Sequence, residues 1–242
     1  MAAGERRLRI LERLLGPGSP ALGTRRLCEV CAEVTAMSGA GIMLMSGDMP
    51  KGSLCSTGKV SDLIERLQFA LGEGPCLDAY HHDRPVLESD LASPSRPRWL
   101  AFAGPAVAAG VRGVFGFPLQ VGSVRLGALS LYRDTAGPLS DDQYADALVL
   151  ANVAAQTVLV LQAQAPPGRL ATELEAGADF QYVVHQAAGM VAVQLQVGVA
   201  QALIRLRAYA FARDRRLAAV AGDVVARRLR FNDTRSAGEL YP

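Results

Sequence analysis

The chemistry of this sequence is most concentrated near its C-terminus, where arginines accumulate. Between Gln201 and Arg230 the chain carries eight arginines against two aspartates. The formal net charge of the whole chain is only +2. A guanidinium group presents a planar fork of N–H donors that matches phosphate. The segment therefore predicts a partner that carries phosphate, contacted by Arg205, Arg207, Arg213, Arg215 and Arg216.

Three short helices joined by tight turns are predicted to present these arginines. Their apolar residues recur every three or four positions, which is typical of helices that share a core. Tyr209 lies among the arginines, where it suits either the edge of the core or stacking on an unpaired base. Gly189, inside the first helix, is predicted to mark a close helix–helix approach. The residues expected inside are Phe180, Val184, Ala187, Val191 and Leu195, then Val199, Ala202, Leu203, Leu206 and Ala210, then Leu217, Val220, Val224 and Leu229.

Cysteines offer a second kind of chemistry. Cys28 and Cys31 form a C-x-x-C inside a helical pattern, away from the helix start that would lower a thiol pKa. We expect them to be buried structural thiols. Cys55 has a loop-like setting, and Cys76 follows Gly-Pro near a helix start, which makes it the best candidate for a reactive thiol. A role in the core remains the ordinary use of such a residue. Four cysteines without a secretion signal predict reduced thiols.

Other patterns for catalysis or metal binding are weak. His81, His82 and Asp83 follow Cys76 closely, but this spacing matches no familiar zinc pattern, so a solvated loop is favoured. Gly72 and Gly74 are not followed by Gly-Lys-Ser/Thr, so they do not form a phosphate loop. We therefore predict no catalytic residue, no metal and no enzymatic activity.

Composition places the chain among ordinary globular proteins. Half of its 242 residues are hydrophobic and 20% are charged, which suits one large or two small domains. The longest apolar run, 147–161, is interrupted by polar residues and is predicted to be too short for a membrane span. We expect a cytoplasmic protein with no membrane contact. Residues 1–168 hold 15 basic and 16 acidic residues, whereas residues 169–242 hold 10 and 7, so the basic excess lies in the last third.

Helices and strands alternate in the first two thirds, and some strands form hairpins. This order favours an antiparallel sheet flanked by helices, an α+β fold. Leu8, Leu11 and Leu15 share one face of the first predicted helix, and Ser140 is predicted to cap the last one. The predicted helices are 4–15, 20–37, 60–71, 99–109 and 141–164, and the predicted strands are 41–45, 53–56, 85–87, 113–119 and 125–132. The predicted divisions are an N-terminal extension (1–19), a first domain (20–164), a second domain (165–231) and a tail (232–242).

Two resemblances follow from particular segments. Residues from about 20 to 162 resemble actinobacterial GAF domains, on Leu-Gly-Glu-Gly-Pro-Cys-Leu-Asp-Ala at 71–79, Gly-Val-Arg-Gly-Val at 110–114 and Leu-Gly-Ala-Leu-Ser-Leu at 126–131. Residues from about 170 to 230 are similar to ANTAR domains, the RNA-binding output modules of antitermination regulators. That match rests on Val-His-Gln-Ala-Ala-Gly-Met at 184–190, on 202–210 and on Leu-Ala-Ala-Val-Ala at 217–221.

The resemblances imply a fold and a function together. They imply a GAF-like sensor linked by a long helix to an all-α three-helix ANTAR bundle that binds RNA hairpins in nascent transcripts and prevents termination. The GAF resemblance also implies a small-molecule pocket, with no other cofactor. Candidate lining residues are Cys76, Trp99, Phe102 and Arg112, although the two aromatic residues suit a core equally.

One departure from the ANTAR pattern and two alternatives accompany this reading. The pattern usually has lysine where this chain has Ala188, so a cation expected to face phosphate is missing. This difference favours an alternative, in which the bundle is a dimerisation or protein-docking module with degenerate RNA binding. A second alternative is a GAF-fold, cysteine-dependent methionine-sulfoxide-type reductase that uses Cys76.

A homodimer is also expected. The helix predicted at 141–164 carries enough apolar residues for a two-stranded seam. These residues are Leu148, Val149, Val153, Val158 and Leu159.

Overall fold

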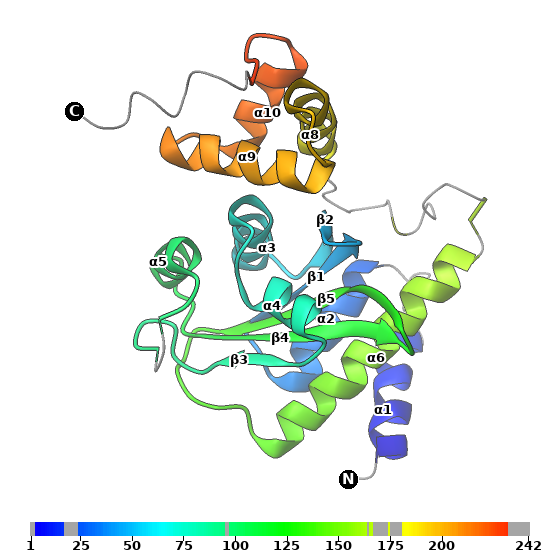
Figure 1. The fold of residues 1–242 in the computed structure, drawn as a ribbon. Helices are drawn as coiled ribbons and strands as arrows, with labels where there is room; N and C mark the ends of the chain where they lie inside the picture. The colour runs from blue at the N-terminus through cyan, green and yellow to red at the C-terminus, as the bar shows by residue number, and fades with distance from the viewer. Residues whose placement is uncertain are drawn as a thin grey trace. The chain divides into compact units, whose positions relative to one another are not determined.

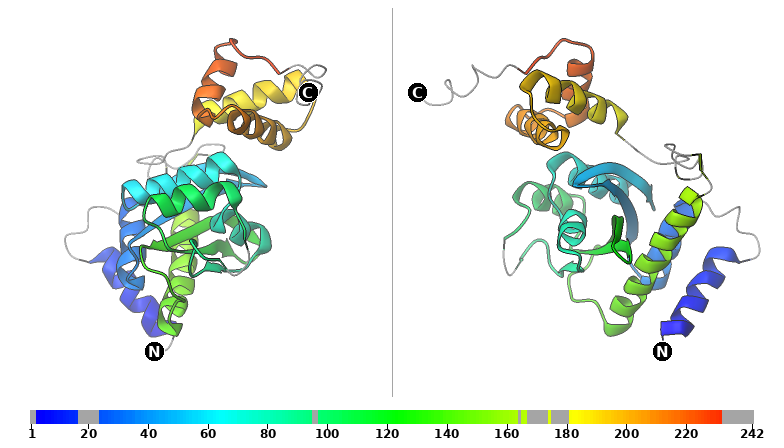
Figure 2. Two further views of the ribbon diagram at one scale, coloured as in Figure 1. Left: turned by 90° about the vertical axis from the view of Figure 1, so that its left-hand side faces the viewer. Right: turned by 45° about the vertical axis from the view of Figure 1, so that its right-hand side comes forward.

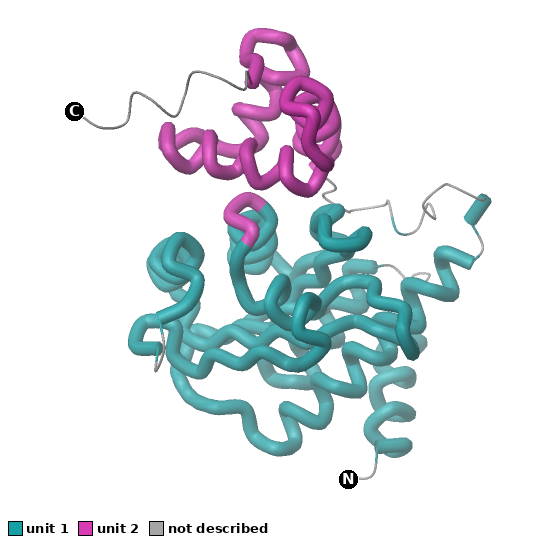
Figure 3. The backbone as a smooth tube through the Cα atoms, in the orientation of Figure 1, with its two compact units in different colours: residues 1–69, 73–180 teal, residues 70–72, 181–242 magenta. Residues whose placement is uncertain are grey.

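The computed structural model describes residues 3–16, 24–94, 97–163, 165, 166, 174 and 181–231 (Figure 1). The chain divides into two compact units (Figure 3). The first unit lies within residues 1–180, and the second begins at residue 181, with residues 70–72 grouped with it. The predicted tail, 232–242, and most of the segment that joins the units lie outside the described residues.

The first unit contains a sheet and six helices in its described part. The helices are α1 (Ala3–Leu15), α2 (Thr24–Thr35), α3 (Lys59–Leu71), α4 (Pro75–His82), α5 (Leu100–Ala108) and α6 (Asp141–Ala163). The strands are β1 (Gly39–Ser46), β2 (Met49–Ser56), β3 (Val86–Glu88), β4 (Gly113–Val121) and β5 (Val124–Arg133). Each predicted element is present, with ends that differ by a few residues.

The five strands form one sheet in the order β2-β1-β5-β4-β3, and all neighbours are antiparallel. β1–β2 and β4–β5 are hairpins, and the second turns at Gly122, whose φ of 58° suits glycine. The predicted α+β fold with an antiparallel sheet is confirmed.

Opposite faces of the sheet carry different helices. α2 and α6 pack on one face, with α1 against α6 on the outer side, and α4 packs on the other face (Figure 2). The first face is apolar, because alternate residues of each strand point into the core. Its fully buried residues include Ile42, Phe115, Phe117, Leu119, Leu129 and Leu131. The second face is mixed, because it carries Gly41, Gly116 and Ser130 as well as the buried apolar residues Met43 and Val114.

α1 turns two leucines of its predicted apolar stripe outward, while the third, Leu11, is half-buried and packs against the core. Leu8 and Leu15 share a face, but they are 63% and 65% exposed. The inward face includes Arg6, whose guanidinium donates hydrogen bonds to Asp142 and, at 2.8 Å, to Asp146 on α6. An arginine that packs inward on acidic partners cannot be distinguished from a solvated one by periodicity alone. α1 therefore belongs to the first unit rather than forming a separate extension.

α6 begins with the predicted cap. The Ser140 hydroxyl accepts a hydrogen bond from the Gln143 backbone N–H, and the Gln143 side chain accepts one from the Ser140 N–H, which is a capping box. By length and composition this 23-residue helix is able to cross a membrane, contrary to the sequence-based expectation. Its buried residues nevertheless form part of the sheet core.

The predicted dimer seam on α6 does not form a continuous exposed surface. Val153 and Val158 are 2% and 5% exposed, because both pack into the core of their own unit. Leu148 is 42% exposed, and Val149 and Leu159 are half-buried. The five residues therefore point in more than one direction around the helix.

A disulfide joins Cys28 on α2 to Cys55 on β2, with Cα atoms 6.2 Å apart. The prediction of four reduced thiols is therefore wrong for these two residues, and Cys55 lies in a strand rather than a loop. Cys31 remains a buried free thiol. Burial raises the pKa of Cys31 to about 12, so it is held as an inert thiol.

Reduction of this disulfide should destabilise the first unit. The bonded cysteines are 27 residues apart, so loss of the cross-link should lower the free energy of unfolding by about 3 to 4 kcal/mol. Urea unfolding with and without dithiothreitol measures this difference. The double variant Cys28→Ser/Cys55→Ser is the control, since its stability should not respond to dithiothreitol. Equal midpoints for the oxidised and reduced wild type would contradict the prediction.

The second unit is a three-helix arrangement of α8 (Tyr182–Leu195), α9 (Val199–Ala212) and α10 (Leu217–Val225). Each helix packs on the other two. The third helix ends before Leu229, the last residue that the sequence predicts on its inner face, because the backbone leaves the helix and Arg227 takes a φ of 60°. Most predicted core positions are buried. They are Val184, Ala187, Val191, Ala202, Leu203, Leu206, Ala210, Leu217, Val220 and Val224.

A few predictions for this bundle need correction. Val199 is 42% exposed at the first residue of α9, and Leu229 lies beyond α10 and is half-buried. Phe180 lies outside the described residues. A Cβ added at Gly189 would meet no described atom within 4 Å. This glycine therefore does not mark a close approach of helices within the described bundle.

Candidate functional site

A stripe of polar side chains follows the buried face of α3. Ser61, Glu65 and Gln68 are spaced by four and three residues, so they lie on one side of the helix. Each is no more than 1% exposed. The buried face of a helix is ordinarily apolar, and buried polar groups are functional candidates for that reason.

Hydrogen bonds connect this stripe to α4 and to the sheet. The Gln68 side-chain amide donates to the Ser130 hydroxyl on β5 at 3.1 Å. Its carbonyl oxygen accepts from the Cys76 backbone N–H at 2.8 Å. The Cys76 sulfur and the Ser130 oxygen are 2.7 Å apart. Glu65, Gln68, Cys76 and Ser130 therefore form one buried group, here called the polar cluster.

Glu65 is the exception within the polar cluster, because its carboxyl oxygens make no hydrogen bond of ordinary geometry within the described residues, and the Ser130 hydroxyl is only close enough to influence the pKa. Burial raises the pKa of Glu65 to about 8, and the charge of Asp62 acts in the same direction. The nearby Ser130 hydroxyl has the opposite effect on the pKa. Glu65 is thus largely protonated at neutral pH, which is unusual for a carboxyl group.

The sheet below the polar cluster is lined by glycine. Gly41 pairs with Ser130 across β1 and β5, and Gly39 pairs with Tyr132. A Cβ at Gly41 would lie 2.8 Å from the Glu65 carboxyl group. Any larger residue at this position would displace Glu65, so glycine is what lets the carboxyl group approach the backbone of β1.

Cys76 lies at the start of α4, as the sequence indicates, but it is only 1% exposed. Burial raises the pKa of its thiol well above the usual range, and the charge of Glu65 adds to the effect. The thiol contacts Ser130 rather than solvent. A nucleophilic thiolate is not favoured here, so the geometry gives no support to a reductase that uses Cys76.

The two aromatic pocket candidates fill space instead of lining an opening. The Trp99 indole N–H donates to Asp78 at 2.9 Å, and the Arg98 guanidinium lies 4.4 Å from the centre of the indole ring. Phe102 meets the edge of Trp99 and is fully buried. Both rings therefore serve the packing of α5 against α4, the ordinary use of such residues.

Arg112, His81 and His82 are not part of the polar cluster. Arg112 forms a bidentate ion pair with Asp90 at 3.0 and 3.1 Å, which fixes the loop after β3. His81 and His82 are at the end of α4, and His82 is exposed. In the described ranges no group of three His, Cys, Asp or Glu side chains is arranged to hold a metal.

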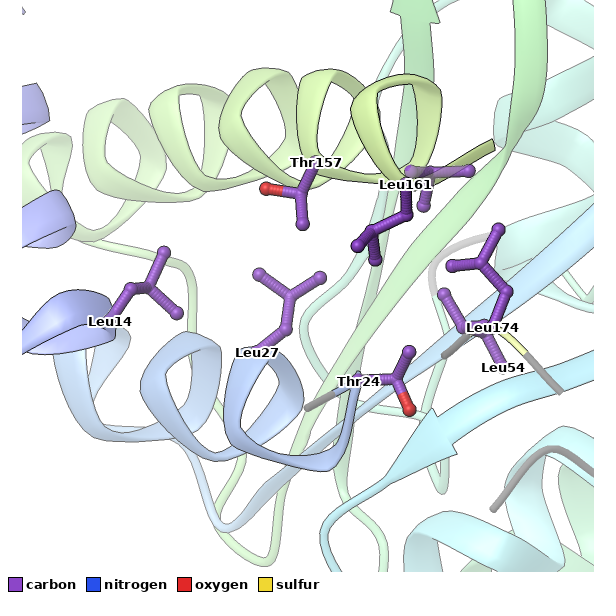
Figure 4. A pocket seen from close by; sticks show the side chains of 8 residues that line it. Leu14, Thr24, Leu27, Leu54, Thr157, Leu161 and Leu174 are labelled. Carbon is purple, nitrogen blue, oxygen red and sulfur yellow. The ribbon is translucent and has the colours of Figure 1, made fainter. Parts of the chain in front are cut away.

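An apolar cavity opens on the other side of the sheet, between α1, α2, α6 and β2 (Figure 4). Its lining includes Leu14, Leu27, Leu54 and Leu161, whose side chains point toward one another. The space measures about 10 Å³, which at most suits a single water molecule. This cavity is a packing defect rather than a ligand site.

Comparison with protein families decides the identity of the first unit. The family described as GAF domain matches residues 24–161, which is more than half of the chain. This chain belongs to the GAF domain family. No curated protein matches it.

Several solved structures are similar to this chain. The GAF domain from Acinetobacter phosphoenolpyruvate-protein phosphotransferase is 13% identical, with a TM-score of 0.51 over 67% of this chain and 98% of that one. The corresponding domain from Coxiella burnetii is also 13% identical and covers 67% and 95%, with a TM-score of 0.49. The type II free methionine-R-sulfoxide reductase from Thermoplasma acidophilum is 17% identical and covers 64% and 92%, with a TM-score of 0.44. The similarity to the Acinetobacter domain shows the fold alone.

The polar cluster of the GAF unit was missed by sequence reasoning, except for Cys76. A signal was present, because Ser61, Glu65 and Gln68 replace apolar residues at one face of an otherwise amphipathic helix. Ser130 carries no such signal. It joins the group only because β5 lies beside β1 in the sheet.

The arginines of the second unit are on its surface. Seven of the eight are exposed, and Arg207 is half-buried. They extend from α9 through the α9–α10 turn to the residues after α10. The exposed ones are Arg205, Arg213, Arg215, Arg216, Arg227, Arg228 and Arg230.

Two sets of contacts draw these arginines together. Asp223 on α10 accepts hydrogen bonds from Arg215 at 2.6 Å and from Arg228 at 2.9 Å, so the turns before and after α10 are linked. The Arg213 guanidinium lies 3.8 Å from the centre of the Tyr209 ring, and Phe231 packs 5.2 Å from that ring. Tyr209 therefore supports Arg213, whose guanidinium lies over one face of the ring.

Ala188 faces the interior of the bundle. It is 0% exposed, next to Ala187, which is equally buried. The expectation that a side chain at position 188 faces phosphate is therefore wrong for this chain. Its inward direction follows from the helical spacing to Val184 and Val191, which are also buried.

Proposed function

We propose that this protein is a signal-responsive transcription antitermination regulator in which the GAF unit controls RNA-hairpin binding by the second unit, an ANTAR domain. It acts in the cytoplasm on nascent transcripts and needs no catalytic residue. The observation that carries the proposal is the set of seven exposed arginines on one small helical unit.

RNA suits this surface better than a simple anion does. Exposed guanidinium groups supply phosphate contacts in number, and they also stack on unpaired bases. Hairpin loops offer both features, because their bases are already splayed. The link through Asp223 holds Arg215 and Arg228 on a common surface, so two stretches of chain contribute to one contact.

The docking-module alternative loses its main argument. It was favoured by alanine in place of a phosphate-facing lysine, but position 188 is buried. A lysine there would not reach RNA from the bundle as it stands. The exposed arginines are unaffected by that substitution.

We also propose a homodimer, because two second units are then able to engage two hairpins. The exposed apolar side chains of α1 and α6 support this proposal. Leu8, Leu15 and Leu148 are 63%, 65% and 42% exposed. Burial of these residues against a second copy would remove apolar surface from water.

RNA binding is tested with paired hairpins that carry short exposed loops. If four arginines contact phosphate, affinity should fall about a hundredfold between about 50 and about 200 mM salt. Arg205→Ala should weaken binding about tenfold and reduce the salt slope by about one, because this exposed side chain is on α9. Fluorescence anisotropy at several salt concentrations measures both quantities.

Arg25→Ala is the matched control. Arg25 is an exposed arginine of α2 in the GAF unit, where it pairs with Glu29. Its removal should leave RNA affinity and salt slope unchanged. Binding that ignores salt, or that weakens equally in both variants, would count against the proposal.

A further inference from the structure

The disulfide between Cys28 and Cys55 is unusual for the compartment in which this protein is proposed to act. Both cysteines are buried, at 0% and 4% exposure, and the bond joins α2 to β2. Thiols and dithiol proteins keep most cytoplasmic cysteines reduced, and the disulfides that do form there are usually transient and respond to the redox state. A bond at this place therefore indicates a reversible modification rather than a permanent cross-link.

The other two cysteines do not compete for this bond. Cys31 is on the same helix as Cys28, and burial raises the pKa of its thiol to about 12. Cys76 is at the start of α4, which packs on the opposite face of the sheet from α2, and its thiol contacts Ser130. Cys28 and Cys55 therefore form a pair of their own.

The position of Cys55 gives a small thiol compound a route to the bond. β2 lies at one edge of the described sheet, next to β1, and Cys55 is the last residue but one of β2. The next two residues, Ser56 and Thr57, are half-buried. The end of an edge strand opens locally while the rest of the sheet stays closed. Such an opening exposes the sulfur of Cys55.

The bond also lies beside a buried residue of the segment that joins the two units. Leu27 and Leu54, which directly precede the bonded cysteines, line the apolar cavity together with Leu174, and Leu174 lies next to Leu54 (Figure 4). Leu174 comes between α6 and α8 in the sequence, yet it is 1% exposed and belongs to the core of the GAF unit. The disulfide holds α2 and β2 together around this leucine. Loss of the bond lets the two elements separate and releases Leu174.

We propose that the bond between Cys28 and Cys55 is a redox switch, through which the GAF unit responds to the balance between small thiols and their disulfides. With the bond formed, Leu174 stays in the core. With the bond reduced, Leu174 leaves the core, and the RNA affinity of the second unit changes. The inference rests on the proposed function, because it names the signal to which the antitermination regulator responds.

The chemistry is a thiol–disulfide exchange. The Cys55 thiolate, exposed when the end of β2 opens, attacks the disulfide of a low-molecular-weight thiol and displaces one molecule of that thiol. The Cys28 thiolate then attacks the mixed disulfide at the Cys55 sulfur, which forms the Cys28–Cys55 bond and releases the second molecule. The protein loses two electrons and two protons, and the external disulfide gains them. The reverse sequence restores both cysteine thiols.

The first experiment uses the full chain without RNA, equilibrated in mixtures of glutathione and its disulfide. Alkylation followed by mass spectrometry should show that the Cys28–Cys55 bond forms and breaks reversibly as the ratio changes. Thermolysin cleaves before large apolar residues. Cleavage before Leu174 should be about tenfold faster or more in the reduced protein, because Leu174 must leave the core to be cut. Cleavage before Leu229, which is half-buried in the second unit, is the internal control and should keep the same rate.

The second experiment compares the RNA affinity of the full chain in the two redox states by fluorescence anisotropy. We expect a difference of about fivefold or more. Cys28→Ser/Cys55→Ser should bind RNA like the reduced wild type in every mixture, and Leu174→Ala should do so even when it is oxidised. Cys31→Ala, on the same helix as Cys28, is the matched control and should respond like the wild type.

Four results would overturn the inference. They are a bond that does not form and break in the glutathione series, equal cleavage before Leu174 in both states, equal RNA affinity in both states, and loss of most of the helical circular dichroism on reduction, which would make the disulfide a structural cross-link. These comparisons use the wild type, so they stand even if a variant fails to fold. A chain that binds no RNA in either state contradicts the proposed function, whereas the exchange and the cleavage still decide whether Cys28 and Cys55 form a switch.

Discussion

The wild-type GAF unit should lose stability as pH rises from about 5 to about 8, and Glu65→Gln should remove most of that loss. The folded carboxyl group keeps its proton until its pKa of about 8, whereas an unfolded one releases it near 4.5. In this window the folded state holds more protons, so a rise in pH favours unfolding. The full shift corresponds to as much as about 5 kcal/mol. The stabilising effect of the proton is complete below the unfolded pKa and is lost as the pH passes through the folded pKa.

Urea unfolding at several pH values, followed by the fluorescence of Trp99, measures this loss. Trp99 is the only tryptophan in the sequence, and it lies in the GAF unit, so the signal reports on that unit. Glu12→Gln removes the same charge from an exposed position and should follow the wild type. A wild type with no slope, or a Glu65→Gln variant with the same slope, would show that the carboxyl group is solvated or paired.

Ala188→Lys should unfold the second unit rather than improve RNA binding. The side chain at this position points into the bundle and is 0% exposed. A lysine there adds volume to a filled core and places an ammonium group without a partner inside it. We expect a loss of about 4 kcal/mol or more in the free energy of unfolding, with a parallel loss of RNA affinity.

Circular dichroism on heating and an RNA titration measure the two effects of Ala188→Lys. Gln186→Lys is the matched control, because it adds the same charge at an exposed position of the same helix. Its stability should change by no more than about 0.5 kcal/mol. An Ala188→Lys protein that melts like the wild type and binds RNA more tightly would show that position 188 reaches solvent.

Several structural roles were predicted correctly from residues that are close together in the sequence. The turn at Gly122 separates two runs of strand-forming residues, and the hairpin β4–β5 formed there. Ser140 and Gln143 capped α6 because both partners of the capping box are three residues apart. The buried positions of α9 followed from a spacing of three and four. Each of these features depends on residues that are close in sequence.

Cysteine pairing shows where this reasoning fails. Cys31 is three residues from Cys28, and the sequence drew attention to that pair. The disulfide instead joins Cys28 to Cys55, because the end of β2 lies beside α2 in the folded sheet. The prediction of the inward face of α1 was wrong for a similar reason. Arg6 points inward because it pairs with Asp142 and Asp146, which lie more than 130 residues later in the sequence.

The sequence alone determined the order of helices and strands, the antiparallel sheet and the concentration of arginine in the last helices, since these follow from local periodicity, turns and composition. The resemblance of the first unit to GAF domains rested instead on the motifs at 71–79, 110–114 and 126–131. Tertiary structure decided which groups share an environment. The register of β1 and β5 placed Ser130 opposite Gly41, and the packing of α3 over that pair buried the Glu65 carboxyl group beside Ser130. Burial sets the protonation of that carboxyl group, and burial is a property of residues brought together from distant parts of the chain.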